Sequence, residues 1–376
     1  MSWNFVIGQQ RVKQLLQKSI SSKRVAHAYI FYGSEGVGKD ALVLEFAKVL
    51  NCERQQQEAC GECSSCKKMI TLQHPNVRLI FALPVGKNEK QGDDPVAVLT
   101  ENQITEIREQ LGIKSRDPYH HIEIGKANFI KINSVREIKR ESSLSQIETG
   151  KKIFILLNAE LMNTEAMNSL LKTLEEPLPN TILLLTTSGK DQLLPTILSR
   201  CQLVRCDVLS NEEVEHALME RDGADQASAQ LAAQLANGSY GAAKRLLQKD
   251  VADERATAVE FVRYALSRGK NNVLNAIDEI AAPNDRASVE RWLKLLQSWL
   301  RDAMILRTRT AISTINEEDR KSLENFVAHF PHANLAAAQS AVEGAIAQVD
   351  KNFYLPLILI NLSIDLKRTL AETIES

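Results

Sequence analysis

The stretch GSEGVGKD at residues 33–40 constrains the fold of this chain more than any other. It follows the apolar run AYIFY and precedes the amphipathic run ALVLEFAKVL, an order typical of a strand, a glycine-rich turn and a helix. In a phosphate-binding loop of this kind, glycines let backbone N–H groups approach phosphate and a lysine reaches the β- and γ-phosphates. Gly33, Gly36, Gly38 and Lys39 fit, so the sequence predicts a loop of nucleotide-binding ancestry.

The last position of the loop departs from the pattern. A serine or threonine there normally holds Mg²⁺, whereas this chain has Asp40. A carboxylate would face the phosphates with like charge, which makes ATP binding doubtful. At a helix start the same carboxylate is stabilised by free N–H groups and the helix dipole. Asp40 is therefore also interpreted as a helix cap that partly substitutes for the anion.

A second departure lies at the end of the buried strand IFILL. A phosphate-loop ATPase needs an acid there to hold Mg²⁺, commonly followed by a glutamate that polarises the attacking water. Here the strand runs into Leu157 and Asn158. Glu160 comes later and is assigned to the loop that opens the next helix. Because two magnesium-related positions are missing from separate places, we do not expect this chain to hydrolyse ATP.

Four of the six cysteines crowd into one short stretch, as Cys52, Cys60, Cys63 and Cys66. Four thiolates can close a tetrahedral Zn²⁺ shell, and C-x2-C spacings let one turn of backbone supply adjacent ligands. Such a shell leaves no open position for water, so the metal would be structural. Free or redox-active thiols are the alternative, because the first spacing, C-x7-C, is unusual for zinc.

The segment LPTILSRCQLV places Ser199, Arg200 and Cys201 between a short helix and a strand. From spacing alone, Arg200 is either an ordinary surface or ion-paired residue, or an arginine supplied in trans to a neighbour's ATP. Cys201 and Cys206 lie in an apolar strand region and are interpreted as small buried hydrophobes.

Strand and helix patterns alternate up to about residue 207, and only helices follow. This alternation predicts a parallel α/β sheet in the first part of the chain. Residues 85–127 carry KNEKQGDD and are expected to form an inserted surface excursion with some helix. His120 and His121 fall within it and are expected to be exposed.

Length, net charge and apolar runs limit the kinds of protein that this chain can be. A length of 376 residues favours two or three domains. Lys and Arg total 46 and Asp and Glu total 47, so any contact with DNA must be local. The N-terminus does not resemble a signal peptide, and the longest apolar run, near 355–364, is too short to span a membrane. We expect a cytoplasmic protein without membrane contact.

Four blocks carry a family resemblance: FVIGQQRVKQLLQKSI, HAYIFYGSEGVGKD, AMNSLLKTLEEP and ILSRC. In their order and spacing they resemble the AAA+ clamp-loader subunits of bacterial DNA polymerase III, over most of residues 1–245. The resemblance implies a RecA-like phosphate-loop domain over 1–207 with an inserted zinc module at about 52–66. It further implies a small helical lid over 208–250 and an all-α C-terminal collar over 251–376.

Within that family, the positions at which this sequence differs from the ATPase subunits indicate which class of subunit it resembles. The ATPases carry a hydroxyl residue after the loop lysine, acids at the second-strand end and an arginine in the lid. Here those places hold Asp40, Leu157 with Asn158, and Gly241, whereas Arg200 of the Ser-Arg-Cys motif is retained. This combination resembles the delta-prime class, which implies a non-hydrolysing subunit whose arginine finger serves the neighbouring ATPase.

The resemblance also implies cofactor and partners. Structural Zn²⁺ would bind the four clustered cysteines, and gamma or tau ATPase subunits and delta would complete a hetero-pentameric ring. The sliding clamp and primed DNA would be met through that complex. Two rival hypotheses are an active gamma- or tau-type ATPase with displaced acids, and a zinc-dependent adaptor unrelated to replication.

Overall fold

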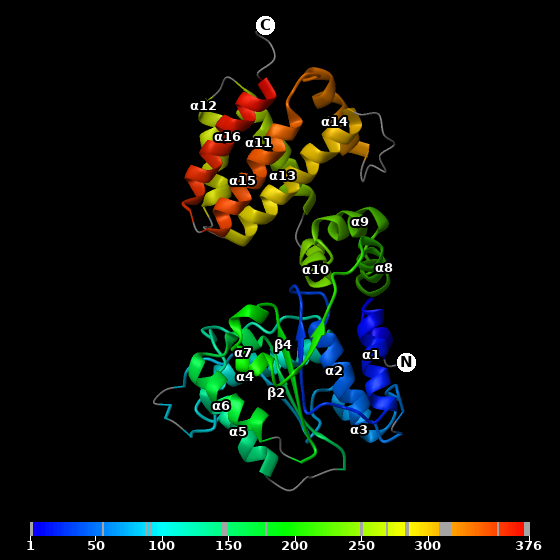
Figure 1. The fold of residues 1–376 in the computed structure, drawn as a ribbon. Helices are drawn as coiled ribbons and strands as arrows, with labels where there is room; N and C mark the ends of the chain where they lie inside the picture. The colour runs from blue at the N-terminus through cyan, green and yellow to red at the C-terminus, as the bar shows by residue number, and fades with distance from the viewer. Residues whose placement is uncertain are drawn as a thin grey trace. The chain divides into compact units, whose positions relative to one another are not determined.

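A computed structural model gives the fold of the chain (Figure 1). The described chain divides into two compact units, Met1–Ala217 with Asn237–Ala242 and Leu218–Ala236 with Ala243–Ser376. The predicted division into a phosphate-loop domain, a lid and a collar stays a prediction. The structure describes residues 3–54, 56–86, 89–90, 92–143, 149–176, 179–248, 251–267, 270–282, 286–307, 317–351 and 353–371.

The first unit is built on a five-stranded parallel sheet with the strand order β2-β3-β4-β1-β5. All five residues of β3 and all seven of β4 are buried, which explains the continuous apolar runs IFIL and ILLL within them. The predicted parallel α/β sheet is therefore confirmed. The strands are β1 (Ala28–Tyr32), β2 (Val77–Ile80), β3 (Lys152–Leu156), β4 (Thr181–Thr187) and β5 (Gln202–Arg205).

Helices cover both faces of this sheet because alternate strand residues point to opposite sides. Tyr29 and Phe31 pack with α2 on one face, and Ile30 packs with α5 and α6 on the other. The helical elements are η1 (Trp3–Phe5), α1 (Gln10–Ser21), α2 (Lys39–Leu50), α3 (Ser64–Ile70), α4 (Glu101–Arg116), α5 (Ile132–Ser143), η2 (Ala159–Leu161), α6 (Thr164–Glu175), η3 (Lys190–Gln192), α7 (Pro195–Leu198) and α8 (Asn211–Asp222), which continues into the second unit.

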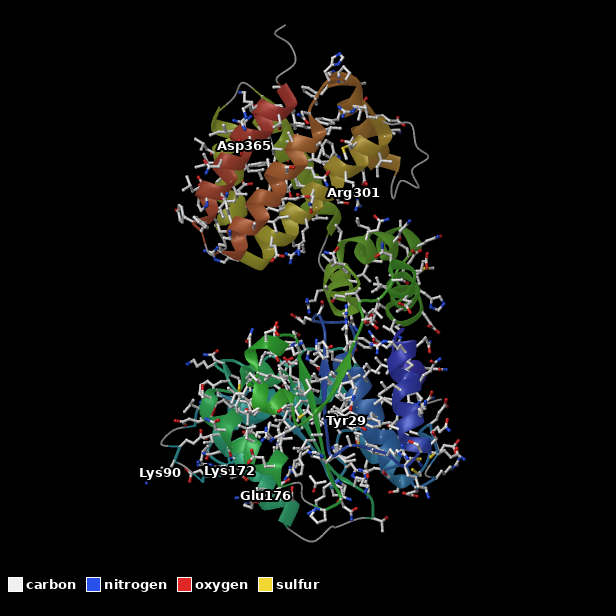
Figure 2. All side chains as sticks on the ribbon, viewed as in Figure 1. Tyr29, Lys90, Lys172, Glu176, Arg301 and Asp365 are labelled. Carbon is white, nitrogen blue, oxygen red and sulfur yellow. The ribbon has the colours of Figure 1, made fainter. Side chains whose placement is uncertain are left out.

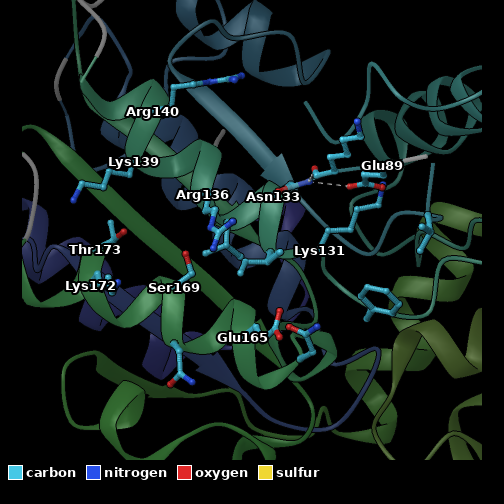
Figure 3. Close-up of a pocket in the computed structure, with 17 residues that line it drawn as sticks. Glu89, Lys131, Asn133, Arg136, Lys139, Arg140, Glu165, Ser169, Lys172 and Thr173 are labelled. Carbon is cyan, nitrogen blue, oxygen red and sulfur yellow. Dashed lines mark hydrogen bonds and ion pairs between the residues drawn. The ribbon is translucent and has the colours of Figure 1, made fainter. Parts of the chain in front are cut away.

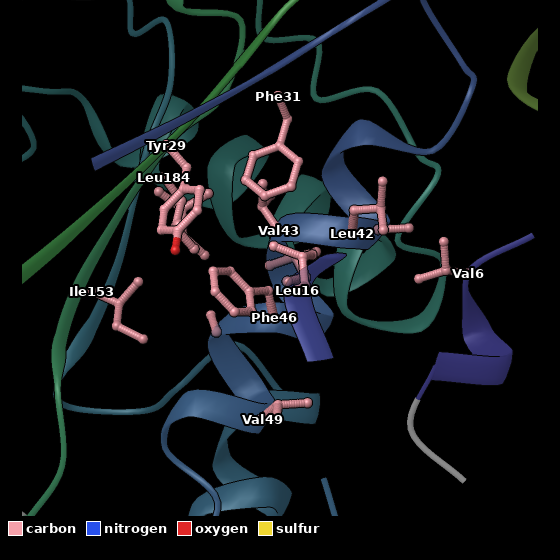
Figure 4. Packing of buried hydrophobic residues seen from close by; sticks show 14 of the residues in the cluster. Val6, Leu16, Tyr29, Phe31, Leu42, Val43, Phe46, Val49, Ile153 and Leu184 are labelled. Atoms are coloured by element: carbon pink, nitrogen blue, oxygen red, sulfur yellow. The ribbon is translucent and has the colours of Figure 1, made fainter. Parts of the chain in front are cut away.

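Aromatic side chains fill the centre of the core between the sheet and α2 (Figure 4). The rings of Tyr29 and Phe46 meet edge to face, with centroids 5.4 Å apart, a geometry that adds about 0.5–1.5 kcal/mol to simple burial. The Tyr29 hydroxyl accepts a hydrogen bond from the Ala26 N–H at 2.9 Å. Tyr29, labelled in Figure 2, is thus buried with its polar group satisfied.

The segment 92–127 contains the helix expected within the excursion, and most of its residues are exposed or half-buried. It forms α4, which begins with a capping box between Thr100 and Gln103. Leu83 joins Leu99, Ile107 and Ile124 of this segment in a small apolar cluster. The prediction that His120 and His121 are exposed is wrong, because both are half-buried and the His120 ring contacts Gln110 Oε1 at 2.7 Å.

The second unit is all-α in its described residues. Trp292, Leu296 and Trp299 lie on one face of α13 and are buried in the core of this unit. Among the helices that the structure describes, none is both long and apolar enough to cross a membrane. The remaining helices are α9 (Gln226–Leu235), α10 (Tyr240–Gln248), α11 (Val251–Leu266), α12 (Lys270–Ala281), α13 (Arg286–Arg307), α14 (Glu317–His329), α15 (Leu335–Asp350) and α16 (Leu355–Ala371).

Truncation in the middle of the sheet will destabilise the first unit. Leu184 of β4 is fully buried between β3 and β1, so Leu184→Ala is expected to lower the free energy of unfolding by about 2–5 kcal/mol. Leu203 of the edge strand β5 is 37% exposed, and Leu203→Ala should cost about 1 kcal/mol or less. Urea unfolding followed by circular dichroism measures both, and equal losses would contradict the prediction.

Candidate functional site

The phosphate loop joins β1 to α2 at the carboxyl edge of the sheet. Gly36 and Gly38 have φ angles of 73° and 102°, in the region that glycine adopts without strain. A Cβ at Gly36 would lie 2.2 Å from Ser239 Oγ, and one at Gly38 would lie 3.0 Å from Tyr119 Oη. Glycine is therefore required here both by backbone conformation and by close neighbours from the chain itself.

The loop lysine is turned inward and fully engaged. Lys39 is 5% exposed, and its Nζ donates to Gly33 O at 2.9 Å, Ser34 O at 2.7 Å and Ser188 Oγ at 3.0 Å. A lysine ammonium has three donors, so all are used. Burial lowers the pKa of Lys39, and the charge of Asp40 opposes that shift.

Asp40 is paired with a buried lysine from α4. Lys114 Nζ lies 2.6 Å from Asp40 Oδ2 and also donates to His120 O at 2.6 Å. Burial alone would raise the pKa of Asp40, but the charge and hydrogen bond of Lys114 outweigh it and hold that pKa below its usual value. The N-cap of α2 is Gly38, so the interpretation of Asp40 as the helix cap is wrong.

The run IFILL spans the end of β3, which ends at Leu156 and is followed by Leu157 and Asn158. No acidic residue therefore stands directly after this strand, where an ATPase of this kind holds Mg²⁺. Glu160 lies in η2, between β3 and α6. Its Oε1 accepts from the Ser188 N–H at 2.9 Å, and Ser188 Oγ accepts from Lys39. Sequence reasoning missed this Lys39, Ser188 and Glu160 cluster, although the position of Ser188 directly after a buried strand was a usable signal.

Arg200 follows α7 and precedes β5, as its sequence context predicts. Its Nη2 lies 3.0 Å from Glu175 Oε1, and its Nη1 donates to Thr196 O at 3.0 Å. The side chain remains 37% exposed. Ser199 is the C-cap residue of α7. The guanidinium is thus oriented by its own chain while staying accessible from outside.

The two cysteines beside Arg200 and β5 differ in burial. Cys206 is 3% exposed, and Cys201 is half-buried against the core of the first unit. Burial raises the pKa of both thiols to about 12. Both groups are therefore protonated thiols at neutral pH, with little nucleophilic character.

The four clustered cysteines come together as the C-x2-C spacings predict. The sulfur atoms of Cys52, Cys60, Cys63 and Cys66 all lie within 4.8 Å of one another. The N–H groups of Cys60, Cys63 and Cys66 each donate to a cysteine Sγ of the cluster at 3.4 Å. Backbone N–H groups of Cys63 and Glu62 lower the pKa of Cys60 to about 6. Burial, in contrast, raises the pKa of Cys66. The proximity of the four sulfur atoms, with N–H donors directed at them, fits a four-sulfur zinc site.

A buried polar chain attaches this cysteine cluster to the sheet. Ser65 Oγ donates to Asn51 O at 2.6 Å and contacts His74 Nε2 at 3.0 Å. Since His74 Nδ1 accepts from the Asn76 N–H at 3.1 Å, Nε2 carries the proton. The Asn51 side chain bonds both the N–H and the carbonyl of Lys151, just before β3. The cluster is thus fixed to the end of α2 and to the start of β3.

A basic cavity of about 990 Å³ lies between α5, α6 and the segment around Glu89 (Figure 3). Glu89 and Lys131 form an ion pair of 2.7 Å at its edge, with both side chains less than 10% exposed. Sequence reasoning missed this cavity because the net charge of the chain is −1. The helical spacing of basic residues in VREIKR was a usable signal. The basic lining residues are Lys90, Lys131, Arg136, Lys139, Arg140 and Lys172.

Removal of metal will test the cysteine cluster. Because a four-thiolate site couples zinc binding to folding, chelation should release about one zinc per chain and lower the thermal midpoint of the first unit. Cys66→Ser should bind less zinc than the unmodified chain, whereas Cys201→Ser, which lies outside the cluster, should retain it. Metal analysis and thermal unfolding measure these effects. A chelated protein with an unchanged midpoint would contradict a structural role.

Comparison with known proteins adds independent findings. The family described as DNA polymerase III, delta subunit, matches residues 8–210, more than half of the chain. DNA polymerase III subunit delta' of Bacillus subtilis is 26% identical over 91% of this chain and 88% of that protein. The Pseudomonas aeruginosa delta' subunit is 32% identical over 65% of this chain and 62% of that protein.

A weaker similarity extends to another subunit type. DNA polymerase III subunit tau of Bacillus subtilis is 28% identical over 52% of this chain and 27% of that protein. The delta' relatives, by contrast, include one that aligns along nearly the whole chain. This chain therefore belongs to the family of DNA polymerase III delta-prime subunits.

Proposed function

We propose that this chain is a clamp-loader subunit that does not hydrolyse ATP itself and supplies Arg200 in trans to ATP on a neighbouring gamma or tau subunit. The observation that carries the proposal is the ion pair between Asp40 and Lys114. It stands where a hydroxyl residue would hold Mg²⁺ in an active loop. With Leu157 and Asn158 at the second-strand end, the chain's own site lacks both magnesium-related positions.

The setting of Arg200 supports a role outside its own subunit. An exposed ion pair such as that with Glu175 contributes only about 0–1 kcal/mol. Glu175 therefore orients the guanidinium without trapping it, and the more highly charged γ-phosphate of a neighbour's ATP can replace the carboxylate. A planar guanidinium can then form paired hydrogen bonds to the phosphate oxygens.

An apolar stripe on the second unit supports assembly into a ring. Tyr354, Leu357 and Ile364 are 71%, 53% and 59% exposed, and their spacing places them along one face of α16 and its entry. Exposed apolar groups that line up in this way mark contact surfaces. We assign this face to contacts with the adjoining gamma, tau or delta subunit of a hetero-pentameric ring.

Two further parts of the first unit fit the same function. The basic cavity between α5 and α6 suits the phosphate backbone of primed DNA, which the complex would engage together with the sliding clamp. The cysteine cluster would hold structural Zn²⁺ and fix the position of the end of α2 relative to the start of β3. We assign the chain to the cytoplasm, where the replication complex would assemble.

Substitution of Arg200 tests the role in trans. In a reconstituted ring with clamp and DNA, Arg200→Ala should abolish productive clamp loading, because an arginine finger supplies on the order of 10³ or more in rate at its own site. Arg200→Lys should not restore loading, since lysine lacks the planar fork. Arg205→Ala is the matched control, because Arg205 is a nearby exposed arginine paired with Asp207.

Gel filtration of each ring separates loss of assembly from loss of activity. Unchanged loading by an intact Arg200→Ala ring would refute the finger. Turnover by the purified chain alone, lost in Lys39→Ala, would instead favour the gamma- or tau-type ATPase.

Substitution on α16 tests the ring surface. Leu357→Glu with Ile364→Glu places charge on the apolar stripe and should lower incorporation into the ring by at least tenfold. Lys321→Ala, at an exposed position of α14 (Glu317–His329) outside the stripe, should leave incorporation unchanged. Analytical ultracentrifugation of the mixed subunits measures both. Normal incorporation of the doubly substituted chain would exclude this stripe from the ring contact.

A further inference from the structure

The phosphate loop is contacted by a part of the chain to which no role has been assigned. Lys114 and Tyr119 belong to the segment 101–120, which comprises α4 and the turn after it. Lys114 reaches Asp40 at the end of the loop, and Tyr119 lies against Gly38. One continuous segment thus meets the loop at the two points where a nucleotide phosphate and its metal ion would bind in an active relative of this loop.

The contact between Lys114 and Asp40 is supported by burial, by helix position and by a second hydrogen bond. The Lys114 side chain is 1% exposed, which is costly unless its charge is paired. Lys114 lies in the last turn of α4 and Asp40 in the first turn of α2, so each charge has the sign that its own helix end favours. Two of the three Lys114 donors are satisfied, by Asp40 Oδ2 and by His120 O.

Tyr119 forms the second half of the contact. Its hydroxyl accepts a hydrogen bond from the Ile7 N–H at 2.7 Å and would lie 3.0 Å from a Cβ at Gly38. Its ring packs edge to face on Tyr240, with centroids 4.8 Å apart. Gly241 N–H, next in the chain, donates to Gly36 O at 3.2 Å. The phenol is therefore held from two sides against the backbone that approaches phosphate in such loops.

We propose that the segment 101–120 is a built-in ligand of the phosphate loop, in which Lys114 replaces the metal cation at Asp40 and Tyr119 covers the phosphate-binding backbone at Gly38. The loop then keeps one conformation without any nucleotide. Mg²⁺-ATP is excluded, because its entry would leave the buried Lys114 and Asp40 charges unpaired. This inference deepens the proposed absence of ATP hydrolysis and rests on it, but it is independent of the role proposed for Arg200, and its tests use the isolated full-length chain.

A double-mutant cycle tests the proposed pair. Lys114→Met and Asp40→Asn should each lower the thermal midpoint, and the doubly substituted chain should lose less than the sum of the two. Lys126→Met is the matched control, since Lys126 is an exposed lysine just beyond the same segment, and it should leave the midpoint unchanged. Strictly additive losses, or no loss in Lys114→Met, would overturn the proposal.

A second measurement uses the unaltered chain and holds even if a variant fails to fold. Mg²⁺-ATP at millimolar concentration should change neither the thermal midpoint of the chain nor the deuterium exchange of the backbone amides of residues 34–40. A midpoint raised by Mg²⁺-ATP, or slower exchange of these amides when Mg²⁺-ATP is added, would overturn the proposal. Neither result depends on the ring, so failure here is distinct from failure of the Arg200 experiment.

Discussion

The parallel sheet is the constraint on which the rest of the first unit depends. In parallel strands the carboxyl ends meet at one edge, so the segments that follow β1, β3 and β4 are brought together there. Lys39, Glu160 and Ser188 come from these three segments and meet in one hydrogen-bonded cluster. A different order of strands would have left each of these polar groups with another partner.

Charge balance at this edge explains how the buried lysine and the aspartate of the phosphate loop are accommodated in the fold. A buried charge must be paired and hydrogen-bonded. Lys39 is satisfied by backbone carbonyls and Ser188, and Asp40 is satisfied by Lys114. Substitution of the hydroxyl residue by aspartate is therefore tolerated only because α4 brings a lysine to the same point. The ion pair of Lys114 with Asp40 therefore links α4 to the phosphate loop.

Sequence patterns predicted those parts of the site that are local in the chain. The phosphate loop follows from a strand, turn and helix, and the cysteine cluster follows from spacing within residues 52–66. The pairing of Lys114 with Asp40 joins residues 74 positions apart and leaves no periodic signal. The basic cavity was hidden because its charges are offset elsewhere in a nearly neutral chain. Single long-range side-chain contacts are thus what periodicity and motif spacing could not supply.

Rigidity at one end of the sheet and accessibility at the other suit a subunit that acts on its neighbour. The phosphate loop is fixed by the ion pair of Asp40 with the buried Lys114, which is broken only at high cost. Arg200, in contrast, is held by an exposed pair that is cheap to break. In our proposal the guanidinium is therefore the group that responds to ATP, and the nucleotide belongs to the adjoining subunit. A phosphate loop that opened and closed with its own nucleotide would move β1. Because β1 pairs with β5, that motion would also displace β5 and with it Arg200, which lies just before this strand.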